Sequence, residues 1–281
     1  MRRALILALL VAVMASPARA ADYAGPLIDA HSHVPNAIAI NAYAAAAKRH
    51  NISKVLLLGV GGVQKDDPAW IAAAQKKYPD LVIAGAPVAD PAAPERVESE
   101  IDRLKARALG EVHVRQPSRK IDRDPSDAEL QTLLALAAKH KLPVVIHDDL
   151  DTRATERLDR ALAAQRGATI VLAHAGDSAP PRIESLLGRH PNLLVDLSGM
   201  HFQRKPSLAT ETGPLDPAWK ALIEKMPDRF LFGIDVWAPR LFEPTMLDRL
   251  MRWTRRVLGE LKPDVAERVA YGNAAALLGV K

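Results

Sequence analysis

The sequence contains no cysteine, so no disulfide bond can hold the folded chain together. Its first apolar run, from Ala4 to Ala15, has 12 residues, fewer than the ~20 that a membrane-spanning helix needs. No glycine fingerprint of the dinucleotide-binding kind follows an apolar run, and no stretch rich in proline and glycine divides the chain. These absences favour one domain that is stabilised by its apolar core, for which 48% hydrophobic residues are ample.

The first 20 residues have the pattern of a secretory signal peptide. Met1-Arg2-Arg3 gives a positive start, the short apolar run follows, and Ala18-x-Ala20 is a small-residue cleavage site. We therefore expect residues 1–20 to be removed and residues 21–281 to form the mature domain, in the periplasm or secreted. Most of the net charge of +5 belongs to the leader, so the mature chain is nearly balanced. It has no basic run typical of nucleic-acid binding, and we expect neither nucleic acid nor a membrane as a partner.

Short apolar runs alternate with segments of helical periodicity along the mature chain. The expected strands are 27–31, 54–60, 81–88, 110–115, 142–147, 168–174, 192–198 and 230–235. The expected helices are 38–50, 68–78, 94–108, 127–140, 153–165, 181–189, 216–226, 245–259 and 264–279. Eight such repeats predict an α/β protein with a single-domain (β/α)8 TIM barrel. The alternative is an open doubly wound sheet, but the sequence lacks the glycine motif typical of the dinucleotide-binding sheets of that kind.

Four of these strands end in a side chain that can bind a metal ion. His31 and His33 are two residues apart and project from one face of the first strand. Alone, this pair is equally compatible with a strand end carrying two solvated histidines. His147, His174 and Asp235 close the fifth, sixth and eighth strands, however, and a closed barrel brings all these ends to one mouth. The pattern therefore predicts a shared site for a divalent metal ion such as Zn²⁺.

The order of these residues resembles that of the amidohydrolase superfamily. Asp29-Ala-His-Ser-His33 is similar to its opening motif, and Phe232-Gly-Ile-Asp235 and Tyr271-Gly-Asn-Ala-Ala-Ala-Leu-Leu-Gly279 resemble the end of its amidohydrolase-related branch, also called amidohydrolase 2. Two shorter stretches, Pro79-Asp-Leu-Val-Ile-Ala84 and Leu194-Val-Asp-Leu-Ser-Gly199, fit the same branch.

This resemblance implies a barrel that binds one or two divalent ions. His31, His33 and His147 would be metal ligands, and Asp235 would contact both the metal and the attacking water. His174 would bind a second metal ion or, in a one-metal site, would orient the substrate. A metal ion lowers the pKa of its bound water towards ~7, and a carboxylate beside that water can accept its proton. Asp235 is the candidate for this catalytic role, with His174 as the second candidate catalytic residue.

Alternation along Gly110-Glu-Val-His-Val-Arg115 places Glu111, His113 and Arg115 on one face of the fourth strand, towards the barrel interior. Buried without partners, they would cost several kcal/mol, so we expect them to be paired. Two-metal members of the superfamily often carry a bridging carboxylated lysine here, which this sequence lacks. The stretch Leu109-Gly-Glu111-Val instead resembles the strand-four glutamate of TatD-type deoxyribonucleases, which is a metal ligand. Glu111 is therefore predicted to bridge two metal ions, and the alternative is an internal ion pair with Arg115.

Substrate-binding residues are sought in two long polar connections, Arg115 to Asp127 and Gly199 to Pro217, because both follow strands at the catalytic end of a barrel. Arg115, His113 and His201 are the candidates, together with Arg204 and Lys205. A guanidinium can bind both oxygens of a carboxylate. Ordinary surface charge is the alternative interpretation, most of all for Arg204 and Lys205.

Together these patterns predict an exported metal-dependent hydrolase that attacks a carbonyl, ester, amide or lactone bond of a small molecule. Three alternatives stay open: a non-oxidative decarboxylase of the same branch, a TatD-like phosphoester hydrolase, and a barrel that binds a metal or ligand without catalysis. The nearly balanced mature charge disfavours a nuclease. Asp235 disfavours a pure binder, which needs no base. Self-association into a homo-oligomer is left open.

Overall fold

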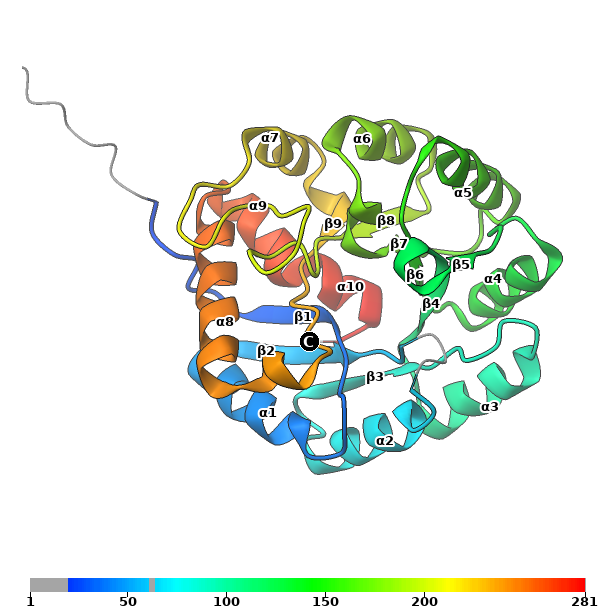
Figure 1. Ribbon diagram of the computed structural model, residues 1–281, viewed down its shortest axis with the longest axis horizontal. Helices are drawn as coiled ribbons and strands as arrows, with labels where there is room; N and C mark the ends of the chain where they lie inside the picture. Colours follow the sequence, from blue (N-terminus) through cyan, green and yellow to red (C-terminus); the bar gives the residue numbers. More distant parts are fainter. Residues whose placement is uncertain (1–19, 61–63, 281) are drawn as a thin grey trace, which may run out of the picture.

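Parallel strands alternate with helices throughout the computed structural model, which describes residues 20–60 and 64–280. The strands are β1 (Leu27–Ser32), β2 (Ile52–Leu57), β3 (Val82–Ala86), β4 (Ala108–Gln116), β6 (Val144–Asp148), β7 (Ile170–Leu172), β8 (Leu193–Asp196) and β9 (Phe230–Leu231), paired in this order. The main helices are α1 (Ala39–Arg49), α2 (Asp67–Lys77), α3 (Pro94–Leu104), α4 (Ala128–His140), α5 (Thr152–Ala164), α6 (Pro180–Arg189), α7 (Pro217–Lys225) and α8 (Pro244–Gly259). Figure 1 shows these helices surrounding the strands. The predicted (β/α)8 barrel is confirmed.

Backbone hydrogen bonds join the last strand segment to the first. The amide of Ala30 donates to the carbonyl of Phe232 at 3.0 Å, and the amide of Asp235 donates to that of His31 at 2.8 Å. The strand predicted over 230–235 is regular only at Phe230–Leu231. Asp235 has a φ of 57°, a value that ends an extended strand and turns the chain. The segment therefore follows β1 without forming a regular ladder.

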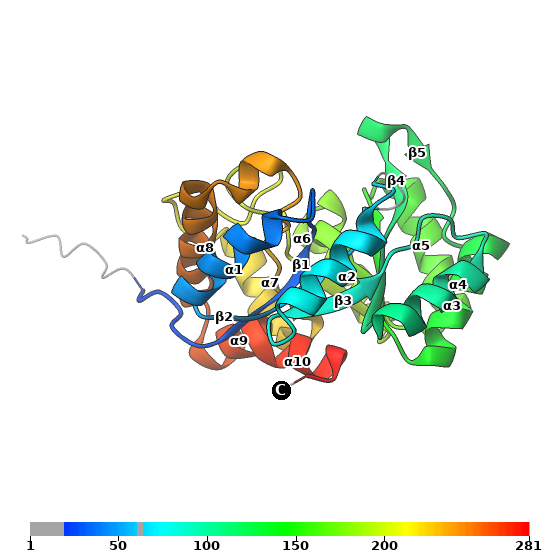
Figure 2. The same cartoon turned by 90° about the horizontal axis from the view of Figure 1, so that it is seen from below.

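The apolar core has two layers. An inner cluster fills the barrel with residues from several strands, among them Ile28, Leu56 and Val145, and α10 (Asn273–Leu278) adds Ala274 and Leu278 to it. An outer, larger cluster lies between the strands and the surrounding helices. Figure 2 shows α10 at the end of the barrel opposite the projecting β4–β5 segment. The inner cluster and α10 thus close one end, and polar side chains occupy the other.

The helix predicted over 264–279 is interrupted in the structure. It consists of α9 (Pro263–Glu267), a π-helical turn (Arg268–Gly272) and α10. A short strand that the sequence did not predict, β5 (Ile121–Asp122), pairs antiparallel with β4. Among the described helices, none has the length and apolar character required to cross a membrane. The predicted signal peptide falls, except for its last residue, outside the described residues and stays a prediction.

Irregularities in β1 and β4 bring polar side chains into the barrel mouth. Between Asp29 and Ser32, β1 has one residue more than the paired stretch of β2. Between Leu109 and Val112, β4 likewise has one residue more than the paired stretch of β6. Such bulges redirect the side chains that follow them. Gly110 suits the second bulge because its φ is +126° and a Cβ there would lie 2.5 Å from the carbonyl oxygen of Val145.

Candidate metal centre

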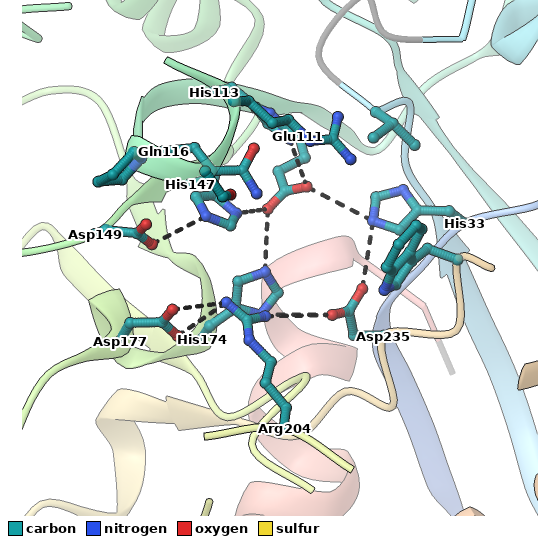
Figure 3. Close-up of a pocket in the computed structure, with 15 residues that line it drawn as sticks. His33, Glu111, His113, Gln116, His147, Asp149, His174, Asp177, Arg204 and Asp235 are labelled. Atoms are coloured by element: carbon teal, nitrogen blue, oxygen red, sulfur yellow. Dashed lines mark hydrogen bonds and ion pairs between the residues drawn. The ribbon is translucent and has the colours of Figure 1, made fainter. Parts of the chain in front are cut away.

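A buried cluster of histidines and carboxylates lies at the carboxyl ends of the strands, with Glu111 in its middle (Figure 3). Glu111 Oε2 lies 3.8 Å from His31 Nε2, 3.6 Å from His33 Nε2 and 3.1 Å from His113 Nε2. The other oxygen, Oε1, lies 3.0 Å from His147 Nδ1 and 3.3 Å from His174 Nε2. The two carboxylate oxygens of Glu111 therefore face two different sets of histidines.

The first strand supplies two of these histidines, and each has its second ring nitrogen held by an oxygen. Asp196 Oδ2 accepts from His31 Nδ1 at 2.8 Å, and the carbonyl of Leu58 accepts from His33 Nδ1 at 2.9 Å. The two Nε2 atoms then face each other at 3.2 Å. Both Nε2 atoms therefore point to the same place, as in metal sites whose histidines are fixed by outer oxygens.

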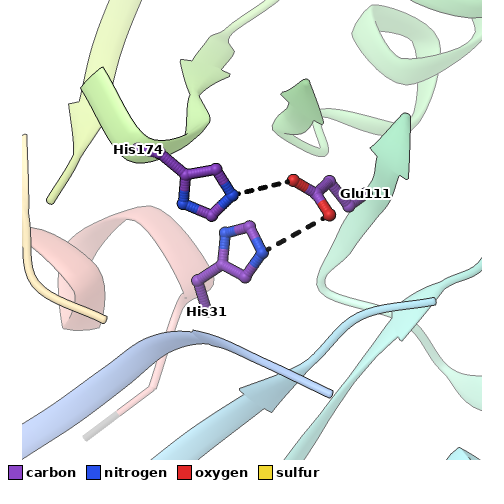
Figure 4. Close-up of side chains that lie close together, drawn as sticks. All are labelled: His31, Glu111 and His174. Atoms are coloured by element: carbon purple, nitrogen blue, oxygen red, sulfur yellow. Dashed lines mark ion pairs between the residues drawn. The ribbon is translucent and has the colours of Figure 1, made fainter. Parts of the chain in front are cut away.

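The same arrangement holds at His147 and His174. Asp149 Oδ1 accepts from His147 Nε2 at 3.1 Å, and the carbonyl of Ser198 accepts from His174 Nδ1 at 2.9 Å. His174 has a φ of 55° within the turn Ala173–Asp177, which directs its ring towards Glu111. Figure 4 shows Glu111 facing both His174 and His31 across the barrel mouth. His113 differs, because its buried Nδ1 has no partner among the described residues.

Asp235 lies at the edge of the cluster, next to His33. Its Oδ1 is 3.6 Å from His33 Nε2, and its Oδ2 is 4.0 Å from His174 Nδ1. Arg204 approaches the same Oδ2 at 3.6 Å through Nη1, while its Nη2 binds both oxygens of Asp177 at 2.8 and 2.9 Å. Asp235 thus has one oxygen directed at the histidines and the other beside a fixed guanidinium.

The members of the cluster differ in the direction in which their pKa values are shifted. Burial raises the pKa of the Glu111 carboxyl, but the surrounding histidines outweigh burial and hold it well below its usual range. Burial lowers the pKa of His33 to about 4, so its ring is neutral at pH 7. Burial also disfavours the charged form of His147, yet the charge of Glu111 raises its pKa to about 10. An anionic Glu111 among several ring nitrogens is a site that favours a cation.

These residues fit a divalent metal ion. Three sets of side chains each offer ligand atoms within 4.8 Å of one another: His31, His33 and Asp235; His31, Glu111 and His174; and Glu111, His113 and His147. Imidazole nitrogen and carboxylate oxygen are the donors that Zn²⁺ accepts in proteins. All six residues predicted as ligands from the sequence are brought together here. Their roles as ligands stay predictions.

Only some of the predicted substrate-binding residues line the cavity above the cluster. His113 lines the cavity above the cluster, but Arg115 and His201 do not. The guanidinium of Arg115 binds Asp151 Oδ2 at 2.8 Å and the carbonyl of Asp149, so it does not form the alternative ion pair with Glu111. His201 is buried beside Phe202, and burial lowers its pKa to about 4. This placement gives no support to substrate binding by Arg115 or His201.

The cavity above the cluster has a volume of about 380 Å³. Beyond the predicted residues it is lined by Val60, Gln116, Pro117, Ser118, Arg119, Asp149, Asp177, Arg204 and Trp237. Of these, only Arg204 is named by the sequence patterns, through its place in a long connection. Asp149 stands two residues after a strand-end histidine, and that position is the one available signal for it. Arg119 and Trp237 stand in loops without periodicity, so no pattern points to them.

Asp196 is a positioning residue for His31 and His174. It is fully buried, and besides His31 Nδ1 it accepts from the backbone amides of His174 at 3.2 Å and Ser198 at 2.9 Å. Burial raises its pKa, but the histidine charges hold it below the usual range. We expect Asp196→Asn to lower affinity for Zn²⁺ about 10–100-fold, because the outer oxygen loses its charge.

Competition with a coloured chelator measures this affinity, and Asp159→Asn is the matched control. Asp159 binds His190 Nε2 at 2.8 Å in the same way, but outside the cavity lining. Equal affinity in the folded Asp196→Asn protein and the parent would show that Asp196 has no part in positioning a ligand.

The fold and the site together define the class of this protein. It is a (β/α)8 barrel with a cluster of histidines and carboxylates at the carboxyl ends of its strands. The chain belongs to the amidohydrolase family, whose model matches residues 28–280. No curated protein matches the chain.

Solved structures share the fold at low sequence identity. An amidohydrolase from Burkholderia multivorans with bound Zn is 17% identical, with a TM-score of 0.62, and the match covers 92% of this chain and 100% of that one. A 2,6-dihydroxybenzoate decarboxylase from Rhizobium is 14% identical, with a TM-score of 0.62 and coverage of 92% and 99%. A TatD-family hydrolase from Entamoeba histolytica is 12% identical, with a TM-score of 0.60 and coverage of 91% and 99%. Proteins similar in fold to this chain thus differ in reaction.

Proposed function

We propose that this protein is a metal-dependent hydrolase of a carbonyl, ester, amide or lactone bond in a small molecule. The observation that carries the proposal is the position of Glu111, whose two oxygens face two sets of histidines. In four of these histidines the outer ring nitrogen is held by an oxygen. A carboxylate in this position suits two divalent ions, and zinc is the proposed metal because the donors are nitrogen and oxygen. The bound ion supplies Lewis acidity that polarises the substrate and makes water more acidic.

The side chains of the site divide the remaining work. Asp235 accepts the proton of the attacking water and returns it to the leaving group, since its Oδ1 points to the cluster. Arg204, fixed by Asp177, holds the other oxygen of Asp235 in place. The proposed ligands are His31, His33, Glu111, His147, His174 and Asp235. Because the mature chain follows a predicted signal peptide, we further propose that this chemistry takes place in the periplasm or outside the cell.

A non-oxidative decarboxylase is the second candidate. The 2,6-dihydroxybenzoate decarboxylase from Rhizobium has the same barrel fold. A carboxylate substrate would be attracted to the positive charge of a metal ion bound at the cluster. A phosphoester hydrolase is supported by the TatD-family neighbour and by the position of Glu111 on β4. A nucleic-acid substrate is disfavoured, because the mature chain is nearly balanced in charge and has no basic run.

Metal analysis of the purified mature protein, followed by removal and reloading, tests the proposal. We expect bound divalent ions, loss of activity after chelation and recovery with Zn²⁺. A screen of lactones, esters, amides, phosphoesters and hydroxybenzoates then identifies the reaction. Carbon dioxide release without hydrolysis would replace the hydrolase by the decarboxylase. A protein that takes up no metal after loading would overturn both.

A further inference from the structure

The connection between β4 and β5 forms one wall of the cavity. Gln116 ends β4, Arg119 ends the short helical turn Pro117–Arg119, and both line the same space as His113 and Trp237. Figure 2 shows this segment projecting beyond the barrel at the end opposite α10. In Figure 3, Gln116 lies on the side of the cavity where His147 and Glu111 are found. A substrate bound in the cavity above the cluster therefore lies beside this wall.

Two polar atoms of this wall are buried without partners. Arg119 Nη1 and Gln116 Oε1 are both inaccessible to solvent and have no hydrogen-bond partner among the described residues. A buried unpaired polar group costs about 1–3 kcal/mol, and more when it is charged. Both residues line the cavity, so a ligand there completes their hydrogen bonds once the two side chains turn towards it. The donor is cationic, so the ligand group that meets it is an anion.

The charges around the cavity distinguish Arg119 from Arg204. The guanidinium of Arg204 is held by both oxygens of Asp177 and lies beside Asp235. Arg119 has no carboxylate partner within the described part of the chain. The carboxylates of Glu111 and Asp235 belong to the cluster. Arg119 is thus the cavity-lining cation whose charge is left for a ligand.

We propose that Arg119 and Gln116 form a subsite for a carboxylate group of the substrate, remote from the bond that reacts at the cluster. This rests on the proposed function, since it assumes that the reacting bond lies at the metal centre. One guanidinium and one amide match the two oxygens of a carboxylate, with the amide turned to donate from Nε2. A phosphate dianion would leave charge unmatched by this single cation. Trp237, 42% exposed, offers an apolar face for the body of the same molecule.

Matched pairs of probes test the subsite on the zinc-loaded protein. The probes are glutarate, adipate and isophthalate, each beside its monomethyl ester, and binding is followed by calorimetry. In each pair one carboxylate can occupy the cluster, and only the diacid offers a second. We expect at least one diacid to bind about 10-fold or more tightly than its ester. In Arg119→Met this ratio should fall to about one, and Arg119→Lys should retain part of it.

The control variant is Lys120→Met, which removes the same charge from the neighbouring residue outside the cavity lining. It should keep the full preference for the diacid. No preference in any pair, or a preference unchanged in Arg119→Met, would overturn the subsite. A fourth pair of probes, 3-phosphonopropionate beside succinate, tests whether the subsite prefers a phosphoryl group or a carboxylate. An Arg119-dependent preference for the phosphonate would replace the carboxylate by a phosphoryl group.

Failure of the subsite and failure of the proposed function give different results. Metal content and hydrolysis of neutral esters are measured on the same preparations. If these are normal while the diacid preference is missing, the hydrolase stands and the subsite falls. If no metal is bound, the proposed function falls, whatever the probes show.

Discussion

Replacing Glu111 with glutamine is expected to reduce the bound metal from two equivalents to one or fewer and to lower activity by more than about 100-fold. Loss of an outer residue that only orients a ligand costs about 10–100-fold, so loss of the bridge itself should cost at least as much. Glutamine has nearly the shape of glutamate, and the variant tests charge and ligand strength rather than packing. Elemental analysis and steady-state kinetics are the two measurements.

The charge of Glu111 has a second role that strengthens this expectation. Five histidine rings surround its carboxylate, and their favourable interaction with the anion holds the Glu111 pKa well below its usual range. A neutral amide in the same place would present an N–H to a ring nitrogen or to the metal. The contact with the metal is unfavourable, because the nitrogen of an amide is a donor and not a ligand.

Glu98→Gln is the matched control for this variant, since Glu98 also contacts a histidine, His140, but on the surface. It should leave metal content and activity unchanged. If Glu111→Gln retained two equivalents of metal, Glu111 would not be a bridging ligand. One equivalent that is unaffected by the substitution would instead indicate a one-metal site in which His174 orients the substrate.

The barrel and the cluster of histidines and carboxylates were predictable from local patterns, because both follow from strand ends. In a closed parallel barrel, every carboxyl end lies at one mouth, so the last polar residue of each apolar run marks the site. That rule brought His31, His33, His147, His174 and Asp235 together before their geometry was known. Glu111 followed from alternation along β4 and from a resemblance, and the structure places it among these histidines.

The cavity wall was not predictable in the same way. Arg119 stands in a three-residue turn, and Trp237 follows a segment without regular structure, so neither has a periodic neighbour that would orient it. Arg115 illustrates a second limit of such patterns. Its alternation with Glu111 was correctly recognised, but beyond His113 the ladder with β6 shifts register, and the side chain binds Asp151 instead. Pattern rules hold within regular strands and fail at their irregular ends.

Replacing Asp235 with asparagine is expected to lower kcat by about 10²–10⁴-fold while KM changes little, the range for losing a general base. The amide keeps the shape of the carboxylate but cannot accept the proton of the attacking water. Because Asp235 Oδ1 is 3.6 Å from His33 Nε2, metal content must be measured beside the rate. Retention of both ions with a reduced kcat would assign the loss to proton transfer.

Asp228→Asn is the control, because Asp228 pairs on the surface with Arg268, outside the cavity lining. The pair of variants also separates catalysis from simple binding. A barrel that only holds a ligand would bind the glutarate or isophthalate probes equally well before and after the Asp235→Asn substitution, and it would show no turnover to lose. A folded, metal-loaded Asp235→Asn protein that keeps the parent's kcat would mean that another group accepts the proton. His174, whose Nδ1 lies 4.0 Å from Asp235 Oδ2, would then be the residue to substitute next.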